Sequence, residues 1–292
     1  MIDLIKALGV FCENPSQEHL KISEVLGFTQ RPSTRLYEEI FVLNLPPYAS
    51  IYTACSGAIG DEAFGRISGF WRALGRDVPD EPDHLSRLLG LFASLDESQS
   101  SEKEPARSVL IRQSRVALLW EHLLPWLPMY LDRVESIGAD TVYSDWAKLL
   151  SETLINEWKS LGPLEGLPIH LAVSPGLPDP REKGADSFIS GLFSPPQAGF
   201  ILLPDDLDKL GAELEYFQLR EGRLSKLEDL LREAPRETLI GLAELAYERS
   251  SDLTTKWDFL GNIALHWKSR SRDSVGLLEQ LARDLEAVTE LT

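Results

Sequence analysis

Eight prolines crowd the interval 161–204 and divide the chain into two regions of helical periodicity. A proline removes a backbone donor and crowds the preceding turn, so this density excludes a long helix there. We expect a Pro/Gly-rich connector with room for a short strand at 199–203. It would separate a helical domain at residues 1–160 from a smaller helical extension at residues 205–292.

Apolar residues recur every three or four positions on both sides of this connector, which predicts an all-α fold. Asp61 and Asp83 stand where helix caps belong. Prolines inside the pattern that starts at residue 106 predict a kink at 124–128. Before the connector we expect a helix near the amino terminus and further helices at 17–27, 34–43, 61–75, 83–95, 106–134 (kinked) and 142–160. After the connector we expect helices at 205–220, 225–234, directly after Pro235, 252–269 and 273–290. The polar run 96–105 is expected to be a loop.

Charge and composition argue against several classes of protein. The 292 residues include 29 basic and 46 acidic ones, a net charge of −17, which disfavours a nucleic-acid partner. No apolar run approaches the ~18 residues of a membrane span, and the first residues do not resemble a secretory signal. Cys12 and Cys55 are too few for a disulfide framework or a zinc motif. We expect a soluble protein of the reducing cytoplasm.

Familiar catalytic motifs are absent from the sequence. It contains no glycine-rich phosphate loop, no GxSxG and no HExxH, and no two of its five histidines are spaced as helical metal ligands. We therefore expect no enzyme activity, no cofactor and no metal.

One candidate binding segment is the acidic turn Asp80-Glu81-Pro82-Asp83-His84. As a structural element it would shape and cap the following helix. As a site, its carboxylates would pair with an incoming guanidinium in a bidentate manner. Apolar residues flank the turn at helical spacing and would form an apolar slot beside it, or belong to the core: Trp71, Leu74, Leu88 and Phe92.

The second candidate segment is WEHLLPWLP, residues 120–128. Its structural interpretation is a kinked helix with Trp120 and Leu123 in the core. Its functional interpretation is a groove opened by the kink, at which His122 and Trp126 would contact a peptide.

Four segments resemble the twin-arginine redox-enzyme maturation chaperones, the TorD/DmsD/NarJ family. YEEIFVLNLPPYASIY at 37–52 resembles the aromatic-rich entry motif of that family. FWRAL at 70–74 followed by DEPDHL at 80–85 is similar to its E-P-x-D-H signature, with the intervening residue absent. Residues 120–130 resemble its H-L-x-x-W-x-P helix, and residues 197–234 resemble the carboxy-terminal part of longer members.

The resemblance implies a single helical-bundle chaperone domain at residues 1–160. Such a protein binds the twin-arginine signal peptide of a redox-enzyme precursor, often a molybdoenzyme, and supports its cofactor insertion and assembly before export. It is not inserted in the membrane and is expected to be a monomer or a domain-swapped dimer. A signal peptide joins a cationic stretch to an apolar one, so its receptor needs carboxylates beside an apolar groove.

On this interpretation, Glu81 and Asp83 recognise guanidinium groups, and Asp80 belongs to the same peptide-binding turn. Pro82 fixes the turn, and His84 bonds the peptide or positions Asp83. Trp71, His122 and Trp126 are further groove candidates. Two alternatives remain open: a metal-assisted hydrolase or lyase that uses Asp83, His84, Glu121 and His122, and a structural helical adaptor for a partner subunit.

Overall fold

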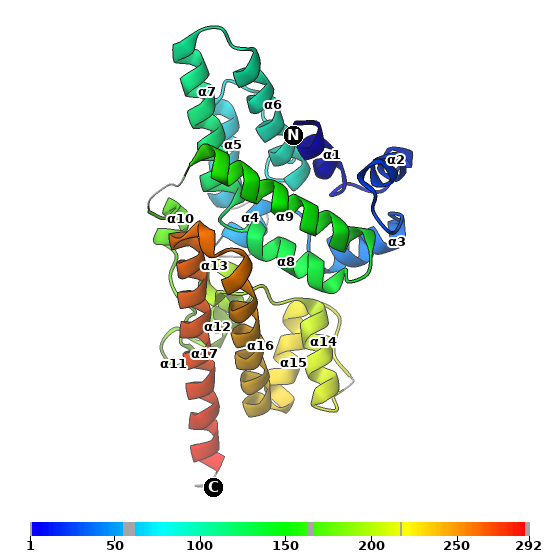
Figure 1. Ribbon diagram of the computed structural model, residues 1–292. Coiled ribbons are helices and arrows are strands. Elements are labelled where there is room, and N and C mark those ends of the chain that lie inside the picture. Colours follow the sequence, from blue (N-terminus) through cyan, green and yellow to red (C-terminus); the bar gives the residue numbers. More distant parts are fainter. Residues whose placement is uncertain (1, 55–61, 163–165, 217, 290–292) are drawn as a thin grey trace. The chain divides into compact units, whose positions relative to one another are not determined.

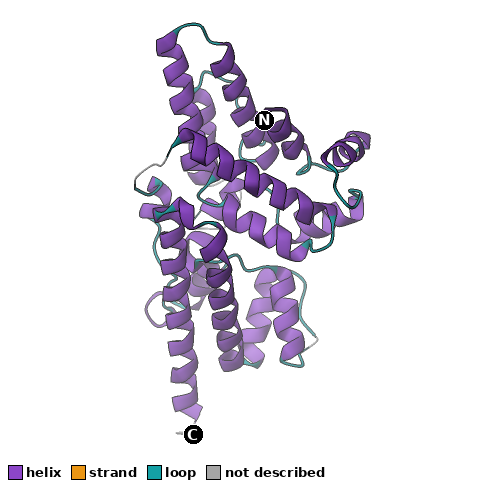
Figure 2. Cartoon of the chain, in the orientation of Figure 1, coloured by secondary structure: helices purple, strands orange, loops and turns teal. Residues whose placement is uncertain are grey.

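The computed structural model describes residues 2–54, 62–162, 166–216 and 218–289. Within these ranges the regular elements are helices, and no strand is formed (Figure 2). The predicted all-α class is confirmed. Two sequence features, Cys55 and the expected cap at Asp61, lie outside the described residues.

The chain packs as two compact units. The amino-terminal unit comprises Met1–Ile51 and Ala58–Ile169, and the carboxy-terminal unit comprises Tyr52–Gly57 and His170–Thr292. The division falls near the start of the Pro/Gly-rich segment. The domain boundaries at 160 and 204 remain predictions.

Two short helices, α4 (Ala49–Thr53) and α10 (Ile169–Ala172), contain the division points between Ile51 and Tyr52 and between Ile169 and His170. The other helices of the amino-terminal unit are shown in Figure 1: α1 (Ile2–Val10), α2 (Gln17–Leu26), α3 (Thr34–Tyr37), the π-helical η1 (Glu38–Asn44), α5 (Glu62–Ala73), α6 (Leu85–Ser101), α7 (Pro105–Ala117), the π-helical η2 (Leu118–Leu123), α8 (Leu127–Ile137) and α9 (Val142–Leu161).

Aromatic side chains hold the core of the amino-terminal unit together. Phe41 of η1 lies edge-on to Tyr143 and Trp146 of α9, with ring centroids 4.9 and 5.7 Å apart. The Trp146 indole N–H donates to the Leu8 carbonyl of α1 at 2.8 Å. Each ring thus buries apolar surface. The indole N–H of Trp146 also has a hydrogen-bond acceptor, which a buried tryptophan needs.

The break predicted at 124–128 is confirmed. The helix loosens into η2, in which the Leu124 amide donates to the Leu119 carbonyl five residues back, and α8 begins at Leu127 with Pro128 in its first turn. A proline lacks an amide proton, so it fits the first turn of a helix, where that proton has no intrahelical partner.

The predicted loop at 96–105 is wrong, because α6 continues to Ser101 and α7 starts at Pro105. A buried ion cluster holds this end of α6. Arg115 of α7 pairs with Asp96 of α6 and with Glu157 of α9, the latter at 2.9 Å. The polar run is helical because its charge partners lie on neighbouring helices, which the local sequence does not reveal.

The carboxy-terminal unit has its own apolar core, centred on Leu192, Leu207, Leu227, Leu242 and Leu278. Its two longest helices, α16 and α17, lie side by side as an antiparallel pair (Figure 1). Its elements are α11 (Pro180–Lys183), α12 (Ala185–Leu192), α13 (Pro195–Ala198), α14 (Pro204–Glu213), α15 (Arg223–Glu233), α16 (Pro235–Lys256), the 3-10 helix η3 (Asp258–Leu260) and α17 (Asn262–Thr289).

Two further expectations for this unit need correction. Residues 199 and 200 form a bend and residues 201–203 have no regular secondary structure, so the expected strand at 199–203 is not formed. The helices expected at 252–269 and 273–290 are divided elsewhere: α16 runs to Lys256 and α17 starts at Asn262. Gly261 makes the break because its φ of 56° favours glycine.

Gly199 lies against the backbone of α17, so a substitution there tests the packing of this unit. It has a φ of +83°, and a Cβ there would lie 2.2 Å from the Ser271 backbone nitrogen of α17. We expect Gly199→Ala to destabilise the unit by about 3 kcal/mol, because a strained backbone and a backbone clash act together. Urea denaturation measures the loss.

Gly222→Ala is the matched control. Gly222 has a similar φ of +86° but open space around it, so we expect a loss of about 1 kcal/mol from strain alone. Equal losses in the two variants would contradict the close approach of Gly199 to α17.

Candidate functional site

The acidic turn predicted from the sequence forms the end of the loop between α5 and α6. This loop is joined to the segment before α4 by an isolated antiparallel bridge between Tyr48 and His84. The Ala49 amide donates to the Asp83 carbonyl at 3.0 Å, and the Leu85 amide donates to the Pro47 carbonyl at 2.8 Å. We call this contact the 48–84 bridge; it fixes the loop against the helical core.

Asp83 reinforces the bridge with its side chain. It is only 1% exposed, and its carboxylate accepts from the Ser50 amide at 3.2 Å and from the Ser50 hydroxyl at 2.5 Å. A buried carboxylate requires such donors, because desolvation otherwise disfavours its charge. In this conformation Asp83 therefore binds Ser50 and does not face an external guanidinium.

His84 provides the cap that was expected from Asp83. It is the N-cap residue of α6, and its Nδ1 accepts from the Ser86 amide at 3.2 Å. Its ring lies edge-on to Tyr48 with centroids 4.9 Å apart. Burial lowers the pKa of His84, although Glu81 and Glu13 act against this shift. The neutral imidazole is thus the form that suits the cap.

A surface pocket of about 640 Å³ lies beside the turn. Asp80 and Glu81, both predicted to bind the peptide, are exposed and line it. The complete lining is Trp71, Asp77, Val78, Pro79, Asp80, Glu81 and Arg87. Three acidic side chains thus face one basic side chain, so the pocket has a net negative lining. We call it the acidic pocket.

Trp71 connects the acidic pocket to the turn. Its indole N–H donates to the carbonyl of the buried Pro82 at 3.1 Å, and its ring is partly exposed. Leu88 and Phe92 are buried core residues of α6 and offer no surface to a peptide. The apolar part of this pocket therefore comes from Trp71, Val78 and Pro79.

The second predicted segment is less accessible. Trp126 is 1% exposed, and its indole N–H donates to the His122 carbonyl at 2.8 Å, so it stabilises the turn before α8. His122 is partly buried against Phe70 of α5, with ring centroids 4.8 Å apart. Neither residue lines the acidic pocket.

The pocket contains residues that sequence reasoning did not select. Asp77 and Arg87 line it, and Arg87 also lies 3.9 Å from the Glu13 carboxylate. Tyr48 and Ser50 bond to the turn from 33 residues away in the sequence. The motif PPYAS contains both, but only the folded chain shows which residues they contact.

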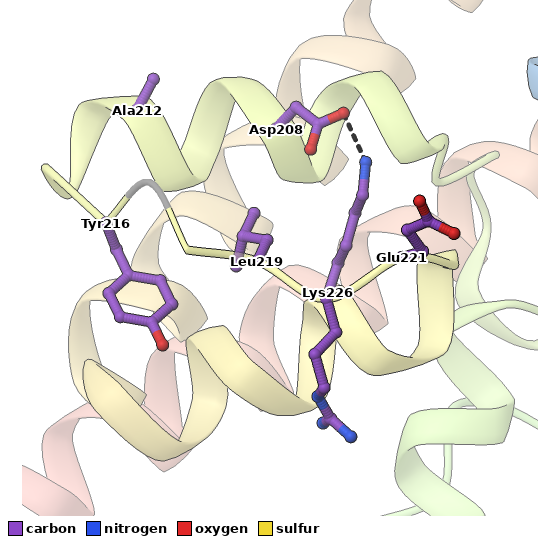
Figure 3. A pocket seen from close by; sticks show the side chains of 7 residues that line it. Asp208, Ala212, Tyr216, Leu219, Glu221 and Lys226 are labelled. Carbon is purple, nitrogen blue, oxygen red and sulfur yellow. Dashed lines mark hydrogen bonds and ion pairs between the residues drawn. The ribbon is translucent and has the colours of Figure 1, made fainter.

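A pocket of about 380 Å³ lies between α14 and α15 in the carboxy-terminal unit (Figure 3). Both basic side chains that line it are already paired with acids. Lys226 contacts Asp208 at 2.5 Å, and Arg220 is held by Asp229 and Glu228. Its charges are therefore largely neutralised within the unit, which makes it a weaker candidate for a charged ligand than the acidic pocket.

The proposed metal ligands do not converge. Asp83 bonds Ser50, His84 caps α6, and His122 packs on Phe70. Over the residues that the structure describes, no three His, Cys, Asp or Glu side chains are grouped as metal ligands. In the same residues, no helix has the length and apolarity to span a membrane.

This geometry defines an all-helical protein with an acidic surface pocket beside a buried Asp–Ser contact. Residues 21–132 match the family model described as "Nitrate reductase delta subunit". The chain is also similar to two curated proteins named "Chaperone protein TorD", from two strains of Vibrio cholerae serotype O1. The identity is 28% over 106 residues for strain ATCC 39541 / Classical Ogawa 395 / O395 and 32% over 107 residues for strain M66-2.

Each match covers 35% of this chain and 48% of the relative, so the chain matches about half the length of these relatives. No solved structure matches. The family resemblance predicted from the EPDHL and EHLLPWLP motifs is confirmed by both comparisons, over residues 21–132 for the family model. The relatives are named chaperones, which agrees with the prediction that this chain is not an enzyme.

The environment of His122 predicts a pH dependence of stability. Burial, with a smaller effect from the nearby Arg66, lowers the pKa of His122 to about 4 from its ordinary value of 6.5. The buried imidazole therefore resists protonation in the folded state, whereas it is protonated below about pH 6.5 in the unfolded state. The contribution of His122 to the free energy of unfolding is therefore constant above about pH 6.5 and decreases as the pH falls toward 4. Between these pH values we expect His122→Gln to lose less free energy of unfolding than wild type, by on the order of 2 kcal/mol.

The measurement is urea denaturation of both proteins between about pH 8 and pH 4.5. Comparison of the two proteins cancels the titration of carboxylates elsewhere. If wild type and variant lose the same free energy of unfolding over this range, His122 is not held neutral in the folded protein.

Proposed function

We propose that the protein is a maturation chaperone that binds the twin-arginine signal peptide of a redox-enzyme precursor in the acidic pocket. The observation that carries the proposal is the lining of this pocket, in which Asp77, Asp80 and Glu81 surround apolar surface from Trp71 and Pro79. Guanidinium groups pair strongly with carboxylates and also stack on aromatic faces.

The relationship to the TorD family supports this proposal, because the curated relatives are chaperones by name and the matching region, 21–132, contains the pocket. The net charge of −17 adds long-range attraction for a cationic segment. At physiological salt this attraction extends about 8 Å from the surface, so the pocket itself must supply the specific contacts.

The residues of the turn have different roles in this proposal. Asp80 and Glu81 are exposed and bind the arginines, whereas Asp83 and His84 are buried and hold the loop that presents them. Pro82 fixes the turn and accepts from Trp71. The chaperone would hold the precursor in the cytoplasm while its cofactor, often molybdenum-based, is inserted and its subunits assemble.

A labelled leader peptide with two consecutive arginines before an apolar stretch tests the proposal. We expect Asp80→Asn/Glu81→Gln to weaken binding at least tenfold, a change of about 1.4 kcal/mol, because both exposed carboxylates are neutralised. Fluorescence anisotropy measures the affinity. Binding of wild type should weaken as salt is added.

Glu152→Gln is the matched control, since Glu152 is an exposed acid of α9 that does not line the pocket. It should bind like wild type. Equal affinity of the double variant and the control, with both folded by circular dichroism, would rule out the acidic pocket as the peptide site.

A further inference from the structure

Glu81 is held in one position by a side chain from outside its own loop. The Tyr48 hydroxyl donates to Glu81 Oε1 at 2.6 Å. Hydrogen bonds from a hydroxyl to a carboxylate are short and about twice as strong as neutral ones. The bond also contributes, after burial, to raising the pKa of Tyr48, so the phenol keeps the proton that it donates.

Tyr48 is itself fixed before it reaches Glu81. It lies at the centre of the 48–84 bridge, between two backbone hydrogen bonds from Ala49 to Asp83 and from Leu85 to Pro47. Its ring lies edge-on to the buried His84. The phenol oxygen therefore projects from a rigid backbone, and the exposed Glu81 side chain receives a fixed donor.

The bond leaves most of the carboxylate available. An ionised carboxylate has about four lone-pair sites on two oxygens, and Tyr48 uses one of them on Oε1. The remaining sites can accept from a guanidinium. A surface glutamate without this donor would sample several rotamers, and binding would have to select one at a cost in conformational entropy.

We propose that Tyr48 is a positioning residue that holds Glu81 in the conformation that receives an arginine of the ligand. This inference rests on the proposed function, because it concerns the same pocket and the same class of cationic peptide. Tyr48 acts through Glu81, so its effect on affinity must disappear when Glu81 can no longer bind a guanidinium.

A double-mutant cycle tests this dependence. Tyr48→Phe keeps the ring on His84 and the backbone bonds of the 48–84 bridge and removes only the hydroxyl. We expect it to weaken binding of the twin-arginine leader peptide by about three- to tenfold in the full chain. In a Glu81→Gln background we expect Tyr48→Phe to have no further effect on affinity.

Tyr247→Phe is the control, because it removes the hydroxyl of a tyrosine that is 65% exposed in the carboxy-terminal unit. It should not change the affinity. Thermal unfolding of each variant separates a loss of binding from a loss of folding.

The outcomes distinguish the two proposals. No peptide binding by wild type removes the proposed function and this inference together. Weaker binding of Glu81→Gln with unchanged or tighter binding of Tyr48→Phe removes the inference alone. Equal losses from Tyr48→Phe in both backgrounds would show that Tyr48 acts independently of Glu81 and would also overturn it.

Discussion

The buried carboxylate of Asp83 is the constraint on which the candidate site depends. A charged group removed from water needs hydrogen-bond donors at fixed positions, and Ser50 supplies two of them. The backbone segments that carry Asp83 and Ser50 are hydrogen-bonded to each other through the 48–84 bridge. The end of the loop between α5 and α6 cannot move without separating this carboxylate from its donors, so the backbone next to the exposed acids keeps a defined position.

This arrangement divides the acidic turn into a buried half and an exposed half that lines the acidic pocket. Asp83 and His84 face inward, where one accepts from Ser50 and the other caps α6. Asp80 and Glu81 face the acidic pocket. The residues that make the motif most recognisable are thus not all accessible. Under the proposed function, a substitution at Asp83 would impair peptide binding through the loop, whereas a substitution at Glu81 would remove a contact with the peptide itself.

The sequence predicted the features that local chemistry determines. Apolar periodicity identified most helices, and Pro125 and Pro128 located the break before α8. Features set by distant partners were missed. The helical end of α6 depends on Arg115 of the next helix, and the role of Asp83 depends on Ser50, 33 residues earlier. Within the site, composition indicated an acidic turn, but burial decided which of its carboxylates are available.

Amide hydrogen exchange on the intact chain, with and without the twin-arginine leader peptide, tests the central claim most directly. We expect the amides of Ala49, Ser50 and Leu85 to exchange slowly already in the free protein, since each is bonded across the 48–84 bridge. Saturating peptide should slow exchange in residues 77–87. Rapid exchange at the three bridge amides, or protection by the peptide confined to other parts of the chain, would contradict the claim.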